Sequence, residues 1–337
     1  MATYLNLEQA MIDGLVKQFK SDKAEAFRAR YFSAKSKLGP EVLEWIRAVD
    51  PGLTDHSERH IENVLDNAYM LISSDLDTLS GLELYFLCQV CLFHDVGNFY
   101  GRSKHNLNIS QVIKKLFSDL FSGVNSRESK LIADAGRAHT GKTGSDPLKG
   151  LAELEHIQGL PVRFQAIAAV VRFADELAEG PQRTSAFMQE EGKIASASSI
   201  YHKYASITNI GIDSHGERII INYEFNIVID QINRNDFRSD LQDLLNFTYG
   251  RISKLDQERK YYNHYRGDFK KIKQMEVVFK FHKDDYQLDF QLEPLLINDL
   301  VVPGHPDTNS FLNYRNDLSI DDVLNAISDE IFAEAQE

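Results

Sequence analysis

The hydrophobic positions of residues 5–177 recur mostly at helical spacing, and long runs of alternating β-branched residues are absent there. Apolar side chains three and four positions apart lie on one face of a helix, where they can be buried together. One such helix begins at Ser57, a good N-cap residue, and another runs from near Gly81 to the dipeptide His94-Asp95. Further helices are predicted at residues 109–121, 128–138 and 162–178. This part of the chain is therefore predicted to be a stack of helices.

The pattern changes after Pro181, where runs rich in Ile, Tyr and Phe begin. The segment Asp213-Ser214-His215-Gly216 between two such runs is typical of a hairpin turn. The order strand, strand, helix, strand, strand predicts a small sheet with a helix on one face. The predicted elements are strands at 205–212 and 218–229, a polar amphipathic helix at 235–262, and strands at 275–281 and 286–292.

We therefore predict a mainly α-helical protein whose helical domain is followed by a small α+β domain of ββαββ type. The expected segments are an N-terminal helical segment at 1–50, the main helical domain at 51–180, the α+β domain at 200–295 and an appendage at 296–337. The appendage contains Pro303-Gly304 and a short acidic helix from Ser319.

Charge narrows the choice of partners. The 337 residues include 37 Lys and Arg against 50 Asp and Glu, which gives a formal net charge of −13. A general nucleic-acid binder normally carries a basic face, so that class is not expected. Only a locally basic pocket or a bound cation would attract an anionic partner. The chain shows neither a signal-peptide pattern nor an apolar run long enough for a membrane span, so we expect a cytoplasmic protein.

Five of the eleven histidines lie between positions 56 and 139. His56 and His60 are four residues apart and share a helix face, and His94-Asp95 ends a largely apolar helix. Asp175 ends another apolar helix, where an acidic side chain without a partner would be poorly solvated. The spacing therefore favours a cluster of imidazoles and carboxylates.

The residues His60, His94-Asp95 and Asp175, with Val64 one turn after His60, resemble the H…HD…D signature of the HD superfamily of metal-dependent phosphohydrolases. The resemblance covers about residues 50–180. It implies a helical HD domain in which these four side chains bind one divalent metal. His56 is the less favoured ligand, because the first histidine of the family is followed by an apolar residue four positions on.

The resemblance also implies a second metal. His105 opens a helix as a ligand histidine does in the two-metal branch that cleaves cyclic dinucleotides, and His139 stands in the place of a later ligand. The chain departs from that branch in two places, with Thr140 instead of a second adjacent histidine and Asn98 instead of a lysine. The GYP signature is missing, so cyclic di-GMP cleavage is not implied. The segment GPQRTSAF and the strand-rich tail resemble a bacterial subgroup of HD proteins that is sometimes linked to Hsp90-like ATPase domains.

Divalent ions explain why these residue types would be needed. A bound ion lowers the pKa of its water from about 15.7 to about 7 and polarises a phosphoryl oxygen. Mixed nitrogen and oxygen ligands suit Mn, Fe, Zn, Co or Ni better than calcium, and Mg stays among the candidates. Asp95 is the expected bridging ligand between two ions, and His139 is the expected proton donor if one ion binds. Substrate phosphate is expected to contact Lys104, Lys142 and Arg183.

The predicted function is hydrolysis of a phosphoester or phosphoanhydride in a small phosphorylated substrate, a nucleotide or nucleotide-derived signal. The alternative is a non-catalytic module that senses a nucleotide in the HD pocket. A third interpretation is a P-loop ATPase, because residues 136–143, GRAHTGKT, fit the P-loop pattern. The preceding segment argues against a P-loop, because it is predicted to be a helix where a P-loop needs a strand. The C-terminal part is expected to narrow substrate access or to form a homodimer, and the sequence leaves both open. Cys88 and Cys91 are interpreted as small core residues.

Overall fold

The computed structural model describes residues 4–141, 146–213, 217–227, 234–284, 286–299 and 311–333. These residues form two compact units. The first unit comprises residues 4–178 together with Glu258–Lys271, and the second comprises Glu179–Asp213, Glu217–Gln257 and the described residues from Ile272 onward.

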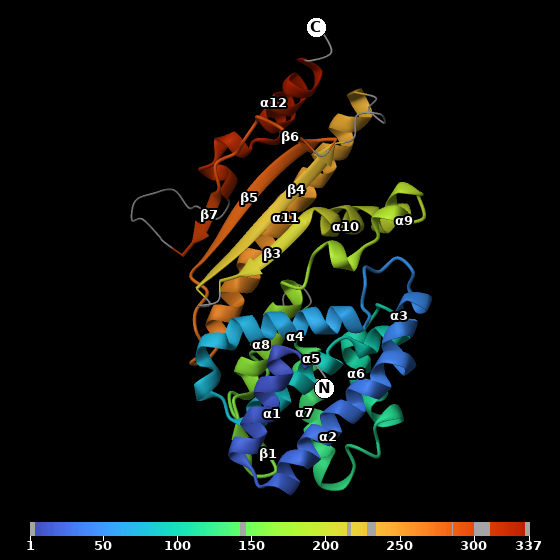
Figure 1. Ribbon diagram of the computed structural model, residues 1–337, viewed down its shortest axis with the longest axis vertical. Coiled ribbons are helices and arrows are strands. Elements are labelled where there is room, and N and C mark those ends of the chain that lie inside the picture. The colour runs from blue at the N-terminus through green and yellow to red at the C-terminus, as the bar shows by residue number, and fades with distance from the viewer. Residues whose placement is uncertain are drawn as a thin grey trace. The chain divides into compact units, whose positions relative to one another are not determined.

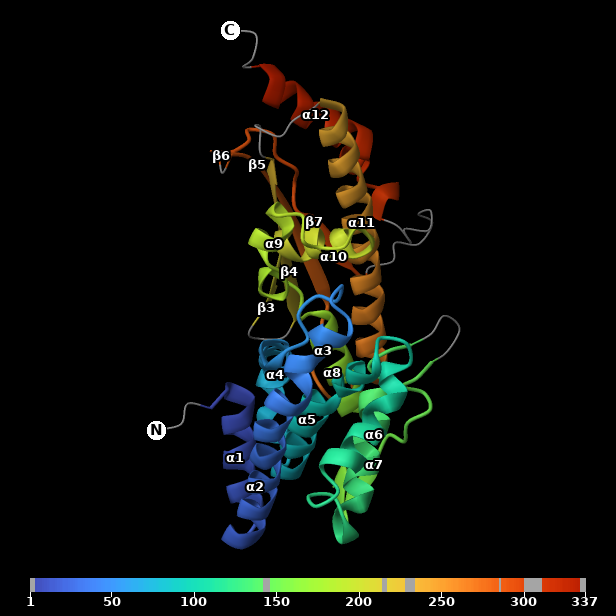
Figure 2. The same cartoon turned by 90° about the vertical axis from the view of Figure 1, so that its right-hand side faces the viewer.

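The first unit is built around one helix, α5 (Gly81–Phe93), whose thirteen residues are all buried. It begins with a capping box, in which Ser80 and Glu83 satisfy each other's backbone N–H groups. An apolar helix of this kind needs neighbours on every side. Figure 2 shows α5 between α1 and α2 on one side and α6 and α7 on the other. The other elements are α1 (Asn6–Gln18), α2 (Ser21–Leu38), η1 (Gly39–Leu43), α3 (Glu44–Val49), α4 (Glu58–Ile72), η2 (Ser73–Thr78), η3 (Val96–Tyr100), α6 (His105–Leu116), η4 (Gly123–Asn125), α7 (Ser126–Arg137), β1 (Glu155–Ile157), β2 (Leu160–Val162) and α8 (Phe164–Glu176).

The predicted helices of this unit are present with shifted ends. The helix predicted at 109–121 begins four residues earlier, at His105, and ends at Leu116. The short hairpin of β1 and β2 was not predicted. Its two turn residues, Gln158 and Gly159, both have positive φ, as a two-residue hairpin turn requires. Two strands of three residues each are too short to show alternation in the sequence.

The second unit contains a five-stranded sheet (Figure 1). β3 and β4 pair antiparallel, β4 and β5 pair parallel, and β5 pairs antiparallel with both β6 and β7. The parallel pairing follows from the helix α11 between β4 and β5, because parallel neighbours need a long crossover. Tyr249 of α11 packs edge-on against Phe279 of β5, with ring centroids 5.9 Å apart. The elements are η5 (Pro181–Arg183), α9 (Ala186–Glu190), α10 (Ser196–Ile207), β3 (Thr208–Ile212), β4 (Arg218–Ile227), α11 (Arg234–Tyr265), β5 (Gln274–Lys283), β6 (Tyr286–Gln287), β7 (Leu295–Asn298), η7 (Phe311–Asn313), η8 (Asn316–Leu318) and α12 (Ile320–Ala333).

The predicted fold class, a helical region followed by a small sheet-containing region, is confirmed. Two strand boundaries are corrected, and one strand was not predicted. The strand predicted from residue 205 begins at Thr208, because the preceding residues end α10. The strand predicted at 286–292 has only two residues, and β7 was not predicted. Residues 214–216 of the predicted hairpin turn lie outside the described residues. In the described part of the chain, no helix has both the length and the apolar character needed to cross a membrane.

Candidate metal centre

Three helix ends of the first unit bring the four predicted ligands of the first metal together. His60 lies in the first turn of α4, which Ser57 caps by accepting a hydrogen bond from the Arg59 N–H. His94 and Asp95 follow the last residue of α5, and Asp175 is the next-to-last residue of α8. Ligands on helix ends can converge without breaking the helices that carry them.

One ligand atom from each of these four residues lies within 4.8 Å of the others. His60 Nε2 is 3.2 Å from Asp175 Oδ1, and His94 Nε2 is 3.5 Å from Asp95 Oδ2. The His60 and His94 side chains are fully buried, whereas the Asp175 side chain is 22% exposed. The group can therefore be reached from solvent on the Asp175 side.

A second group consists of Asp95, His105 and His139, whose ligand atoms also lie within 4.8 Å of one another. Asp95 Oδ1 is 3.3 Å from His139 Nε2 and 3.6 Å from His105 Nε2. Asp95 thus presents Oδ2 to the first group and Oδ1 to the second. Asn98 stands where the two-metal branch has a lysine, and no role was predicted for it. Its side chain donates a hydrogen bond to Asp95 Oδ1 at 2.9 Å and holds the carboxylate in this orientation.

Backbone hydrogen bonds direct the Nε2 atoms of three of the four ligand histidines toward the carboxylates. The Nδ1 atoms of His94 and His105 face the carbonyl oxygens of Cys91 at 2.8 Å and Arg102 at 3.0 Å, and His139 Nδ1 faces the Gly136 carbonyl. A carbonyl oxygen only accepts, so each Nδ1 must carry a hydrogen, and Nε2 of the neutral ring keeps its lone pair. This is the arrangement by which backbone partners orient metal-binding histidines.

The resulting lone pairs fit a cation. His105 Nε2 and His139 Nε2 face each other at 3.2 Å, beside an oxygen of Asp95. Among the described residues, His60 Nε2 and His94 Nε2 are buried and have no hydrogen-bond partner. Buried acceptors that face acceptors are unfavourable unless a proton or a cation lies between them. The two groups therefore have the donor set and the unmet lone pairs expected of metal sites.

The pKa values of the clustered residues show that the two carboxylates attract positive charge. Burial lowers the pKa of His94, but the Asp95 and Asp175 carboxylates outweigh it and raise this pKa to about 9. Burial raises the pKa of Asp95, but the surrounding histidines, His94 first, hold it well below its usual range. Asp175 behaves in the same way beside His60 and His94. For His105, burial prevails and lowers the pKa, so this ring favours its neutral form.

Two glycines let the helix ends approach this closely. A Cβ on Gly97 would lie 1.8 Å from the carbonyl oxygen of His105, so the backbone that carries His105 packs directly on Gly97. A Cβ on Gly136 would lie 3.4 Å from the Cα of His94 and 3.1 Å from the Cδ1 of Ile109. Side chains at these positions would separate the segments that carry His94, His105 and His139.

His56, the less favoured ligand, belongs to neither group but lies beside Asp95 and His60. It precedes α4, so the predicted helix face shared with His60 is wrong. Its Nε2 is 3.7 Å from Asp95 Oδ2, its Nδ1 is 2.6 Å from the Thr54 carbonyl oxygen, and its ring is 5.4 Å from that of His60. The four-residue spacing from His60 was the signal for this position.

The predicted phosphate contacts are distributed differently. Lys104 is exposed next to His105, in a left-handed conformation with φ of 65°. Arg183 is buried in the second unit, where its Nη1 is 4.0 Å from Glu179 Oε2. Lys142 lies outside the described residues. The P-loop interpretation is not supported, because Gly136 and Arg137 are the last residues of α7 rather than the end of a strand.

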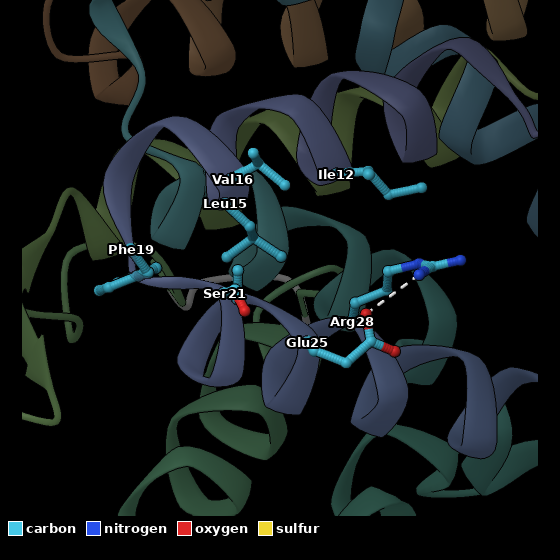
Figure 3. A pocket seen from close by; sticks show the side chains of 8 residues that line it. Ile12, Leu15, Val16, Phe19, Ser21, Glu25 and Arg28 are labelled. Carbon is cyan, nitrogen blue, oxygen red and sulfur yellow. Dashed lines mark hydrogen bonds and ion pairs between the residues drawn. The ribbon is translucent and has the colours of Figure 1, made fainter.

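A hollow of about 370 Å³ elsewhere on the first unit contains none of the predicted site residues (Figure 3). It lies between α1 and α2, and Arg28 and Glu25 form an ion pair of 3.0 Å at its edge. Cys88 and Cys91 are buried inside α5, and burial raises the pKa of the Cys88 thiol.

The family model HD-CE matches residues 50–254, which is more than half of the chain. The chain belongs to the HD-CE family. The predicted membership in the HD superfamily is thereby confirmed, and the match contains all the residues of both groups. It extends beyond the predicted domain end at residue 180 into the second unit. No curated protein matches the chain. An HD-CE domain with buried groups that could bind a metal ion suggests a metal-dependent hydrolase.

Proposed function

We propose that this HD-CE protein hydrolyses a phosphoester or phosphoanhydride bond in a nucleotide or a nucleotide-derived signal, using two divalent ions. The observation that carries the proposal is the position of Asp95, whose two oxygens face two separate sets of histidines. A carboxylate shared in this way is the usual bridge of a two-metal phosphoryl-transfer site.

Ions held there would supply a water with a lowered pKa and would polarise the phosphoryl oxygen. The chain's own residues set the charge of the site. Only Asp95 and Asp175 carry negative charge among the six ligands, so two divalent ions would leave a net charge of about +2. Such a site attracts a phosphate even in a protein with a formal charge of −13.

The other roles follow from position. Asp95 would be a ligand to both ions, and Asn98 keeps its carboxylate in this orientation. Lys104 binds a substrate phosphate beside His105, and Lys142 is proposed to contribute a further cationic contact. If one ion suffices, His139 instead donates a proton to the leaving group. Imidazole and carboxylate ligands favour Mn, Fe, Zn, Co or Ni over calcium, with Mg retained as a candidate.

The test combines metal analysis with a substrate screen. Protein stripped with a chelator is reloaded separately with Mn, Co, Ni, Zn and Mg and assayed against nucleotides, cyclic and linear dinucleotides and simple phosphoesters. The double variant His94→Ala, Asp95→Ala should lose both bound metal and hydrolysis. Replacement of the exposed His156 by Ala is the matched control and should change neither.

Two outcomes would redirect the proposal. Hydrolysis retained by the double variant would refute the metal mechanism. Stoichiometric metal in the wild type without turnover of any substrate in the panel would instead support the alternative, a module that senses a nucleotide in the HD pocket.

A further inference from the structure

Arg172 links the second metal group to two other segments of the first unit. It lies on α8, three residues before Asp175, and its side chain is 13% exposed. Its Nη1 donates a hydrogen bond to the carbonyl oxygen of Ala138 at 3.2 Å. Its Nε and Nη2 donate to the two carboxylate oxygens of Glu258 at 2.7 and 2.6 Å. The guanidinium carbon also lies 4.9 Å from the centre of the Tyr261 ring.

The Ala138 carbonyl belongs to the peptide group that immediately precedes His139. Ala138 is the C-cap of α7, and the last carbonyls of a helix have no partner within the helix. The orientation of this peptide sets the direction in which the His139 ring leaves the backbone. The hydrogen bond from Arg172 therefore helps to fix a ring whose Nε2 lies 3.3 Å from Asp95 Oδ1.

Glu258 fixes Arg172 in turn. A guanidinium paired with both carboxylate oxygens has little freedom to rotate, and the pair is largely removed from solvent, with side-chain exposures of 13% and 12%. The planar fork can bind the carboxylate through Nε and Nη2 and still direct Nη1 at the carbonyl, which an ammonium cannot do. Glu258 belongs to α11, so the last turns of this helix take part in shaping the second group.

We propose that Arg172, which Glu258 holds in place, is a positioning residue for the second metal ion. Arg172 acts on His139 through the Ala138 carbonyl. The inference rests on the proposed two-ion function. It predicts that loss of Arg172 weakens the second ion and spares the first. Asp175 lies on the same helix, but the hydrogen bonds of Arg172 go to Glu258 and to the Ala138 carbonyl, and none goes to a ligand of the first group.

The same helix offers a matched control. Arg163, at the start of α8, forms the same type of pair with Glu83 at 2.7 and 3.0 Å, donates to the Thr78 carbonyl at 2.8 Å and lies 4.7 Å from the Phe269 ring centre. Within the described residues, none of the hydrogen bonds of Arg163 goes to the segments that carry His139 or His105. Arg163→Met should therefore cost stability comparable to Arg172→Met without weakening either ion.

The experiment is a calorimetric titration of chelator-treated full-length protein with Mn²⁺, supported by the visible spectrum of the Co²⁺-loaded protein. Wild type should bind two ions. Arg172→Met should bind the second about 10–100-fold more weakly, the range found when an outer partner of a metal ligand is removed. The Co²⁺ spectrum should change for this variant and stay unchanged for Arg163→Met. Arg172→Lys should also weaken the second ion, because it keeps the charge and loses the fork.

Other outcomes decide against the inference in separable ways. Equal weakening by Arg172→Met and Arg163→Met, or two unchanged ions in Arg172→Met, would show a merely structural role. A wild type that binds a single ion leaves no second ion to position and overturns the inference while hydrolysis by one ion stands. A wild type that binds no ion refutes the proposed function itself. If Arg172→Met does not fold, as circular dichroism would show, Arg172→Lys and Glu258→Gln decide by the same titration.

Discussion

At the scale of single residues, Asp95 faces both metal groups and Asp175 faces only the first. Variants of the two residues should therefore lose different numbers of ions. Asp95→Asn removes the charge that both groups share, so both ions should be lost. Asp175→Asn affects only the first group and should leave the second ion bound. Metal content after dialysis against a small excess of Mn²⁺ measures the difference. If the two variants lost the same number of ions, Asp95 would not be a bridge.

Gly97 permits a second prediction. In Gly97→Ala the new methyl group would lie 1.8 Å from the His105 carbonyl oxygen, so η3 and α6 must separate. We expect a loss of about 1–3 kcal/mol in the free energy of unfolding, as for other overpacked sites, together with a weakened second ion. Gly250→Ala in α11 is the control, because a Cβ there meets nothing within 4 Å. It should stabilise the helix by about 0.5–1 kcal/mol and leave metal binding unchanged. A Gly97→Ala variant as stable as wild type would contradict this packing argument.

The resemblance to the HD signature indicated the six clustered residues, and the structure places each of them at or near a helix end. The resemblance could not show that His56 lies beside Asp95, since the direction of a side chain on the turn before α4 depends on packing. Arg172 and Glu258 were missed for a related reason. They are 86 residues apart, and their partnership exists only once α8 and the end of α11 pack together.

At the scale of elements, Glu83 joins the starts of α5 and α8. Its carboxylate accepts from the Ser80 N–H at 2.9 Å at the start of α5 and from the Arg163 side chain at the start of α8. Burial raises the pKa of Glu83, but the hydrogen bonds from Arg163 and Ser80 outweigh it and lower the pKa. The charged form is therefore the one that stabilises the folded state.

This shift gives a prediction with a definite sign. Glu83→Gln should lower the free energy of unfolding by about 1.5–3 kcal/mol at pH 7, because the buried carboxylate loses its charge-assisted hydrogen bonds with the partly buried Arg163. The contribution is present above the ordinary value of 4.5 and is lost as the pH falls through the lower pKa of the folded state. Urea unfolding at pH 7, 5.5 and 4 should show the two proteins converging below about pH 4.5. A difference that stays constant over this range would show that the charge of Glu83 is not the cause.

The elements that the sequence predicted well are those with long, regular patterns, such as α5 and α11. The parallel pairing of β4 with β5 was not evident from either strand, because alternation shows which face is buried and not which neighbour pairs. Of the single strand expected at 286–292, only the first two residues form β6, and β7 lies beyond it at Leu295–Asn298. A strand of two to four residues is determined by its partner more than by its own sequence.

At the scale of the whole molecule, the change of pattern near Pro181 agrees with the division between the two compact units at Ala178. The return of Glu258–Lys271 to the first unit was not predicted. A continuous polar helix gives no sign in its sequence that its two parts pack with different surfaces. The HD-CE match, which crosses the division, indicates that the family is defined by residues of both units.

Net charge provides the last prediction. A protein with a formal charge of −13 repels anions over about 10 Å at 0.1 M salt. Two of its carboxylates, those of Asp95 and Asp175, lie in the metal-free site itself. Without ions, inorganic pyrophosphate should therefore bind too weakly to detect by calorimetry. With saturating Mn²⁺ the ligand cluster becomes positive, and binding should appear. The variant His94→Ala, Asp95→Ala should show no such gain, whereas His156→Ala should behave as wild type. Equal binding of pyrophosphate to metal-free and metal-loaded protein would contradict this prediction. The pyrophosphate site would then consist of basic side chains elsewhere, and the metal centre would not be what attracts phosphate to this acidic chain.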